Sequence, residues 1–109
     1  MSDVNEVLSN SIKHIFMNAR KITLEQLKQL HFATHDALLS PSDRLEREHK
    51  LRAAMALTNT DHEPVRLVIK LYNDELVEIL SDLIDWEDDY VEIHGGYDIP
   101  LRAIVDVGV

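Results

Sequence analysis

The stretch "ELVEILSDLIDWE" (residues 75–87) decides the fold of this chain, because its apolar residues fit either a helix or a strand. A helix would gather the apolar residues on one face and the acids on the other. The apolar set is Leu76, Ile79, Leu80, Leu83 and Ile84, and the acidic set is Glu75, Glu78, Asp82 and Asp85. A strand would need a bulge near residues 81–82, where the alternation slips. Periodicity alone favours the helix, whereas the segments on either side favour the strand.

Strand patterns flank this stretch on both sides. Residues 65–72 alternate between two faces, and "YND" at their end predicts a tight turn. Downstream, "YVEI" alternates again, "HGGY" predicts a glycine turn, and "DIPLRAIVDV" adds a segment rich in β-branched residues. Pro100 in that last segment predicts an edge position or a strand start, because proline cannot donate to a sheet. The second half of the chain is therefore predicted to be β-structure.

The first half predicts about three helices. Apolar residues at helical spacing predict an amphipathic helix over residues 3–20. A second helix is predicted after Thr23, whose hydroxyl can cap it while the Gln26 side chain reaches back to the Thr23 amide. Ile22 and Leu27 occupy the hydrophobic staple positions around this start. The buried stripe of the second helix is Leu24, Leu27, Leu30, Ala33, Ala37 and Leu38.

A third helix is predicted over residues 41–58. Ser40 precedes it as the capping residue, and Pro41 takes the first helical position, where a missing amide hydrogen costs nothing. Most of its side chains are charged. Four apolar ones are expected to face inward: Leu45, Leu51, Met55 and Leu57.

The size and composition of the chain exclude several classes of protein. With 109 residues it has the size of one domain, which buries roughly two-thirds of the surface of its unfolded chain. It has no cysteine, which excludes disulfides, thiolate metal sites and cysteine nucleophiles. Acids stand near the start, where a signal peptide would need basic residues, and no apolar run is long enough to span a membrane. These features predict a cytoplasmic protein without membrane contact.

The charge is divided unevenly along the chain. Residues 1–62 hold eight basic and eight acidic side chains, whereas residues 63–109 hold three basic and twelve acidic ones and carry the whole net charge of −9. Nine acids lie between Asp74 and Glu92, with no lysine or arginine among them. A solvated surface normally mixes both signs, because like charges repel one another. The acidic run therefore favours a docking surface for a basic partner, and direct binding to nucleic acid is not expected.

From Val65 onward the chain resembles the YolD-like family of small proteins from Gram-positive bacteria and their phages. The matching segments are "VRLVIKLYND", "LVEILSDLIDWE", "YVEIHGGYDIPL" and "IPLRAIVDV", and "LID" (83–85) stands for the family's Ile-x-x-Ile-Asp-like element. The Asp-Arg-Gly-Met element that many members carry near their N-terminus is absent. The resemblance implies that residues 76–86 are extended and belong to a small antiparallel Sm-like or SH3-like β-barrel.

The fold class that follows is α+β, with N-terminal helices preceding the barrel. One domain over residues 1–109 would comprise a helical part (1–60) and a β-barrel part (63–109). Genes of the family often lie near those of Y-family translesion polymerases, and an accessory role has been proposed for its members. The resemblance therefore implies a role in the SOS response of a bacterium or its phage, with a DNA polymerase as the partner.

Two histidines are the candidates for a metal site. His31 and His35 stand four residues apart, a spacing that places both on one face of a helix. The glutamate that a zinc protease carries beside the first histidine is missing, and the alternative is that both flank a contact between helices and barrel. No nucleophile motif occurs, and His94 precedes two glycines without the lysine of a phosphate loop. The sequence thus predicts no enzyme, no metal and no cofactor.

The predicted partner-binding surface lies at the acidic end of the opening stretch. Its residues are Asp82, Asp85, Trp86, Glu87, Asp88, Asp89 and Tyr90. Trp86 either anchors the interface, as aromatic residues often do, or fills one end of the barrel. The leading function is a non-enzymatic interaction module that docks on a basic protein surface, such as that of a polymerase or a nuclease. The alternative is an acidic phage inhibitor, of the anti-CRISPR or anti-restriction kind, that mimics nucleic acid.

Overall fold

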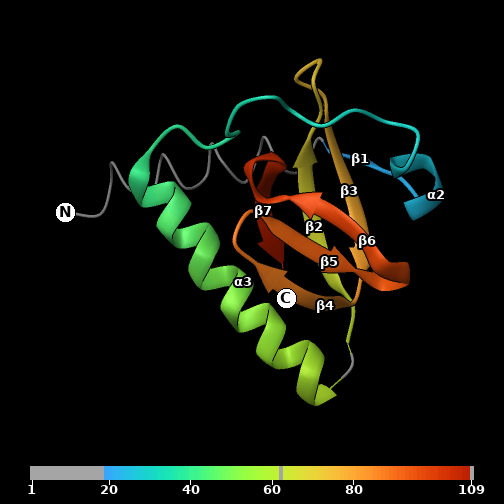
Figure 1. The fold of residues 1–109 in the computed structure, drawn as a ribbon, viewed down its shortest axis with the longest axis vertical. Coiled ribbons are helices and arrows are strands. Elements are labelled where there is room, and N and C mark those ends of the chain that lie inside the picture. The colour runs from blue at the N-terminus through green and yellow to red at the C-terminus, as the bar shows by residue number, and fades with distance from the viewer. Residues whose placement is uncertain (1–18, 62, 109) are drawn as a thin grey trace.

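A computed structural model describes residues 19–61 and 63–108 of the chain (Figure 1). Within these ranges it has two sheets, one long helix and several short helical turns. In chain order the elements are β1 (Arg20–Lys21), α2 (Leu24–Leu27), α3 (Pro41–Asp61), β2 (Val65–Lys70), β3 (Leu76–Ser81), β4 (Leu83–Glu87), β5 (Tyr90–Ile93), η1 (His94–Gly96), β6 (Tyr97–Pro100), η2 (Leu101–Ala103) and β7 (Ile104–Gly108). α3 runs along one side of the strands and contacts β7 and β4 (Figure 1).

The larger sheet has the strand order β1-β3-β2-β7. β2 pairs antiparallel with both β3 and β7, and β1 adds a short parallel edge along β3. The turn between β2 and β3 is the predicted one. Asp74 adopts a positive φ of 69°, and the Leu71 amide donates to the Glu75 carbonyl at 2.9 Å.

The smaller sheet has the order β4-β5-β6 and is antiparallel throughout. Asp88, with a positive φ of 46°, lies in the tight turn between β4 and β5. Gly95 and Gly96, with φ values of 83° and 75°, make the predicted turn between β5 and β6. Glycine adopts such values without steric cost, so this hairpin follows from its local sequence.

Residues 76–81 and 83–87 form strands, and the helix that periodicity alone favoured does not form. The break falls at Asp82, between β3 and β4, where the alternation slips. The pairing of β4 with β5 shifts register between Leu83 and Asp85, so Ile84 is the extra residue of a bulge. Because of this break, β3 belongs to the larger sheet and β4 to the smaller one.

The predicted Sm-like or SH3-like barrel is wrong. In a closed barrel every strand has two hydrogen-bonded neighbours. In the part of the chain that the structure describes, β1 and β7 are edges of the larger sheet, and β4 and β6 are edges of the smaller one. The chain passes from β6 through the turn η2 to β7, which pairs with β2, and both sheets stay open.

The prediction of about three N-terminal helices is also wrong. Of residues 3–20 the structure describes only the last two, and Arg20 begins β1; the rest of that predicted helix lies outside the described residues. The capping box is confirmed. The Gln26 amide donates to Thr23 Oγ1 at 3.1 Å, and the Thr23 amide donates to Gln26 Oε1 at 2.9 Å. The helix that it starts nevertheless ends at Leu27, after one turn.

Residues 31–33 pair with the end of β2 instead of continuing this helix. The Ala33 amide donates to the Lys70 carbonyl at 3.0 Å, and the Tyr72 amide donates to the His31 carbonyl at 3.0 Å. A capping interaction contributes about 1 kcal/mol. It does not hold the following residues in a helix when their backbone groups find partners beside a sheet.

α3 covers the predicted third helix and extends three residues beyond it. Ser40 Oγ accepts a hydrogen bond from the Asp43 amide at 3.5 Å, as expected for its cap. Leu51 is fully buried and Met55 packs against the core, as predicted. The inward orientation predicted for Leu45 and Leu57 is wrong, because both are exposed. α3 therefore contacts the sheets through fewer of its apolar side chains than its sequence predicts.

Candidate functional site

Six carboxylates and one tyrosine share the solvent-facing side of the smaller sheet and its β4–β5 turn. They are Asp85, Glu87, Asp88, Asp89, Tyr90, Glu92 and Asp98, which we call the acidic face. Together they line a hollow of about 410 Å³. β4, β5 and the turn between them supply all of these residues except Asp98, which comes from β6.

Strand register places three of these acids in one row. Asp85 on β4 is the cross-strand partner of Glu92 on β5, and Glu92 is in turn the partner of Asp98 on β6. Residues opposed in this way have Cβ atoms roughly 4.5–5.5 Å apart, and opposed like charges are destabilising. No carboxylate of the acidic face forms an ion pair with a lysine or arginine of the described residues. Asp85 Oδ1 accepts a hydrogen bond from the Trp86 amide at 2.8 Å, but no lysine or arginine of the described residues offsets the repulsion in the row.

The residues between these acids point to the opposite side of the sheet. Trp86, Val91 and Ile99 form the adjacent cross-strand row, and Val91 and Ile99 are fully buried. Successive residues of a strand alternate between its two faces. Core packing on one side of the sheet therefore holds the acids in place on the other side.

Five of the seven predicted site residues lie on the acidic face: Asp85, Glu87, Asp88, Asp89 and Tyr90. The other two do not. Asp82 is half-buried at the junction of β3 and β4. Trp86 is also half-buried, and the guanidinium of Arg52 on α3 lies 5.2 Å from its ring centroid. Trp86 thus packs between the sheet and α3, away from the acidic face.

The acidic face also includes Glu92 and Asp98, which the sequence interpretation leaves out. The signal for Glu92 is the alternation of β5, since it stands two residues after Tyr90. Asp98 comes beside Glu92 only when the turn at Gly95 closes the β5–β6 hairpin. Its membership of the acidic face therefore depends on the register of that hairpin.

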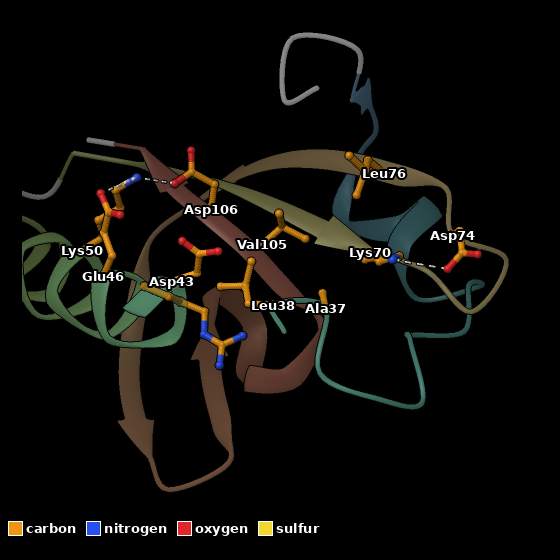
Figure 2. Close-up of a pocket in the computed structure, with 11 residues that line it drawn as sticks. Ala37, Leu38, Asp43, Glu46, Lys50, Lys70, Asp74, Leu76, Val105 and Asp106 are labelled. Carbon is orange, nitrogen blue, oxygen red and sulfur yellow. Dashed lines mark hydrogen bonds and ion pairs between the residues drawn. The ribbon is translucent and has the colours of Figure 1, made fainter. Parts of the chain in front are cut away.

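A second hollow lies between α3, β7 and the β2–β3 turn (Figure 2). It has a volume of about 370 Å³, and we call it the pocket. Its apolar wall consists of Ala37, Leu38, Leu76 and Val105. Its rim carries the charged side chains of Asp43, Glu46, Lys50, Lys70, Asp74 and Asp106. These residues come from distant parts of the chain, so no single stretch of sequence indicates the pocket.

A partly buried ion pair beside the pocket connects α3 to the preceding loop. Arg47 is 5% exposed, and its Nη1 and Nη2 each donate to an oxygen of the Asp36 carboxylate at 2.9 Å. Burial by itself would raise the pKa of Asp36. The hydrogen bonds from Arg47 and from the Leu38 amide, with the charges of Arg47 and Arg44, outweigh burial and lower that pKa from its usual value of 3.8. The carboxylate therefore stays ionised and holds the loop against α3.

We expect this ion pair to make the protein sensitive to acid. A carboxyl group whose pKa is lower in the folded protein stabilises it above the unfolded pKa, which is about 3.9 for aspartate. That contribution is lost as the pH falls through the folded pKa. The free energy of unfolding in urea should thus fall from about pH 5 downward, and Asp36→Asn should make this fall smaller. Identical pH profiles for the variant and the wild type would contradict this expectation.

The two histidines do not form the helical pair that a metal site would need. His31 and His35 follow the end of α2, and both side chains are exposed. The His31 ring contacts the Tyr72 ring edge-on, with their centroids 5.9 Å apart. Across residues 19–61 and 63–108, no three histidine, aspartate or glutamate side chains are grouped to hold a metal ion.

Comparison with known proteins gives no relative: no family model, no curated protein and no solved structure matches the chain. None of the helices in the described ranges has the length and apolar character needed to cross a membrane. What the acidic face and the pocket can bind is therefore inferred from their own geometry and charge.

Proposed function

We propose that this protein is a non-enzymatic interaction module whose acidic face docks on a basic protein surface. The observation that carries this proposal is the row of Asp85, Glu92 and Asp98, which has no cation beside it among the described residues. Such a row lowers the stability of the free protein. A basic partner removes that cost and adds favourable charge complementarity. Tyr90, which is half-exposed within the face, supplies an aromatic surface for an arginine side chain of the partner.

Further features of the chain narrow the choice of partner. The absence of cysteine fits a reducing compartment, so we place the interaction in the cytoplasm. The resemblance of residues 65–107 to YolD-like proteins supports a polymerase of DNA-damage tolerance as the partner. A nuclease has the same kind of basic surface along its nucleic-acid channel, because that channel binds phosphates.

Neutralising the row of acids should weaken binding to a basic partner. For the variant with Asp85→Asn, Glu92→Gln and Asp98→Asn, we expect about tenfold lower affinity for a fluorescent peptide rich in lysine and arginine. The loss should appear largely in the association rate, and rising salt should weaken the wild-type complex through screening. Fluorescence anisotropy over a salt series and stopped-flow mixing would measure these effects.

A matched control variant removes three exposed acids elsewhere, through Glu25→Gln, Glu63→Gln and Asp74→Asn. It has the same net charge as the acidic-face variant, so it separates local recognition from overall charge. The acidic-face variant should be as stable in urea as the wild type, or slightly more stable, because opposed charges are gone. Equal losses of affinity in the two variants would show that the binding is not local to the acidic face.

The same pair of variants can identify the partner in the native host. A docking protein should be retained by the wild type and by the control variant but not by the acidic-face variant. Its displacement from the complex by duplex DNA would assign the acidic face to nucleic-acid mimicry. Retention in the presence of DNA would assign it to docking outside the nucleic-acid channel.

A further inference from the structure

We propose that the pocket binds a small organic cation with an apolar body. The pocket and the acidic face share no residue, so this inference does not depend on the docking function. Its volume of about 370 Å³ lies within the range of small-molecule sites, roughly 300–1,000 Å³. Such sites typically combine an apolar lining with a few polar groups that fix the orientation of the ligand.

The apolar wall of the pocket is open to a ligand. Leu38 comes from the loop before α3, Leu76 starts β3, and Val105 belongs to β7. All three side chains are only half-buried, so they leave apolar surface for a ligand to cover. The pairing of β2 with β7 skips Val105, which makes it the extra residue of a bulge. Bulges redirect side chains, and here the redirected side chain lines the pocket (Figure 2).

The charged rim has an excess of negative groups. Arg47 also lines the pocket, but its guanidinium is already paired with Asp36. The rest of the rim has four carboxylates and two ammonium groups, from Asp43, Glu46, Asp74, Asp106, Lys50 and Lys70. Charge complementarity therefore favours a cation in the pocket over an anion.

Asp43 is the rim carboxylate that the described lysines and arginines leave without a counter-charge. Lys50 is held by Asp106 at 2.7 Å and lies 3.9 Å from Glu46. Figure 2 shows the Asp43 side chain extending from α3 toward β7. An ammonium group on the α3 side of the pocket would contact Asp43 and Glu46, while its hydrocarbon part covers the apolar wall. A protonated amine with a short hydrocarbon chain has this chemistry.

Three probes with six carbon atoms each separate the effect of charge from that of the hydrocarbon: hexylamine, hexanol and hexanoate. In NMR titrations of the wild-type protein, hexylamine should shift the amide signals of Leu38, Leu76 and Val105 in a saturable manner. Hexanol should shift the same signals with about tenfold lower affinity, and hexanoate should bind more weakly still. An absence of saturable hexylamine shifts, or hexylamine shifts centred outside the pocket, would overturn the proposal.

Two double variants test the role of the rim. Asp43→Asn with Glu46→Gln should lower the affinity for hexylamine about tenfold and leave the affinity for hexanol unchanged. Both substitutions keep the side-chain shape, and the NMR spectrum verifies the fold of each variant. Asp85→Asn with Glu92→Gln removes the same charge from the acidic face and should leave hexylamine binding unchanged. Equal losses in the two double variants, or hexanoate binding as tight as hexylamine binding, would overturn the proposal.

Discussion

Replacing Leu51 with alanine is expected to lower the free energy of unfolding by about 2–5 kcal/mol, the usual range for leucine-to-alanine changes in protein cores. Leu51 is fully buried and belongs to the core cluster that joins α3 to the sheets. Its truncation removes apolar contacts and leaves a cavity that neighbouring side chains fill only in part. The loss is large against a total stability of roughly 5–15 kcal/mol for an ordinary domain.

Leu45 on the same helix provides the matched control. It is 53% exposed, although its spacing along the sequence predicts a buried position. Leu45→Ala should change the free energy of unfolding by about 0.5 kcal/mol or less, because little apolar surface is lost and alanine favours the helix. Urea unfolding of the two variants measures the difference. Similar decreases in the free energy of unfolding for Leu51→Ala and Leu45→Ala would show that α3 packs against the sheets with a different face.

The second large effect is expected from Arg47→Met. This change keeps an apolar stem but leaves the Asp36 carboxylate and the Ile104 carbonyl without the donors of Arg47. Removing one partner of a buried ion pair costs about 3–5 kcal/mol. We expect a loss at the lower end of this range, because the Asp36 side chain is 24% exposed and Arg44 lies 3.6 Å from it.

Arg52→Met is the control for this prediction. The Arg52 side chain is 67% exposed, and it pairs with Glu48 at 2.8 Å across one turn of α3. Exposed ion pairs contribute about 0.2–1 kcal/mol. In urea, Arg52→Met should therefore lower the free energy of unfolding by less than Arg47→Met does. Combining Arg47→Met with Asp36→Leu should cost less than the sum of the single changes, because no unpaired charge remains. Additive costs would mean that Arg47 stabilises the protein through packing alone.

Features that depend on residues close together in the chain follow from the sequence. The hydrogen bonds between Thr23 and Gln26, the start of α3 at Pro41 and the turn at Asp74 all occur where they were predicted. Each depends on side chains and backbone groups within four positions of one another. Tertiary contacts have little influence over such short distances along the chain, so the sequence was sufficient for them.

The acidic face could be predicted only in part. The acids of β4 and the following turn are consecutive, so the sequence shows their clustering directly. The register of β5 and β6 places Asp98 beside these acids. Trp86 lies on the other face of the sheet, because alternate residues of β4 point to opposite faces. Both outcomes depend on residues 83–87 being a strand, which their periodicity did not decide. The pocket gave no sequence signal, because its walls come together only in the folded chain.

By itself, the sequence determined the turns at Asp74 and at Gly95–Gly96, the start of α3 and the acidic character of the second half. Only the tertiary structure decided how far the helix after Thr23 extends and which strands pair. Ala33 bonds to Lys70, 37 positions away, and β7 pairs with β2 while β6 remains an edge. Backbone groups bond to whichever partner the folded chain brings near. The apolar periodicity of one segment contains no information about that partner, which is why sequence patterns alone predicted a barrel that does not close and a helix after Thr23 that is longer than the observed one.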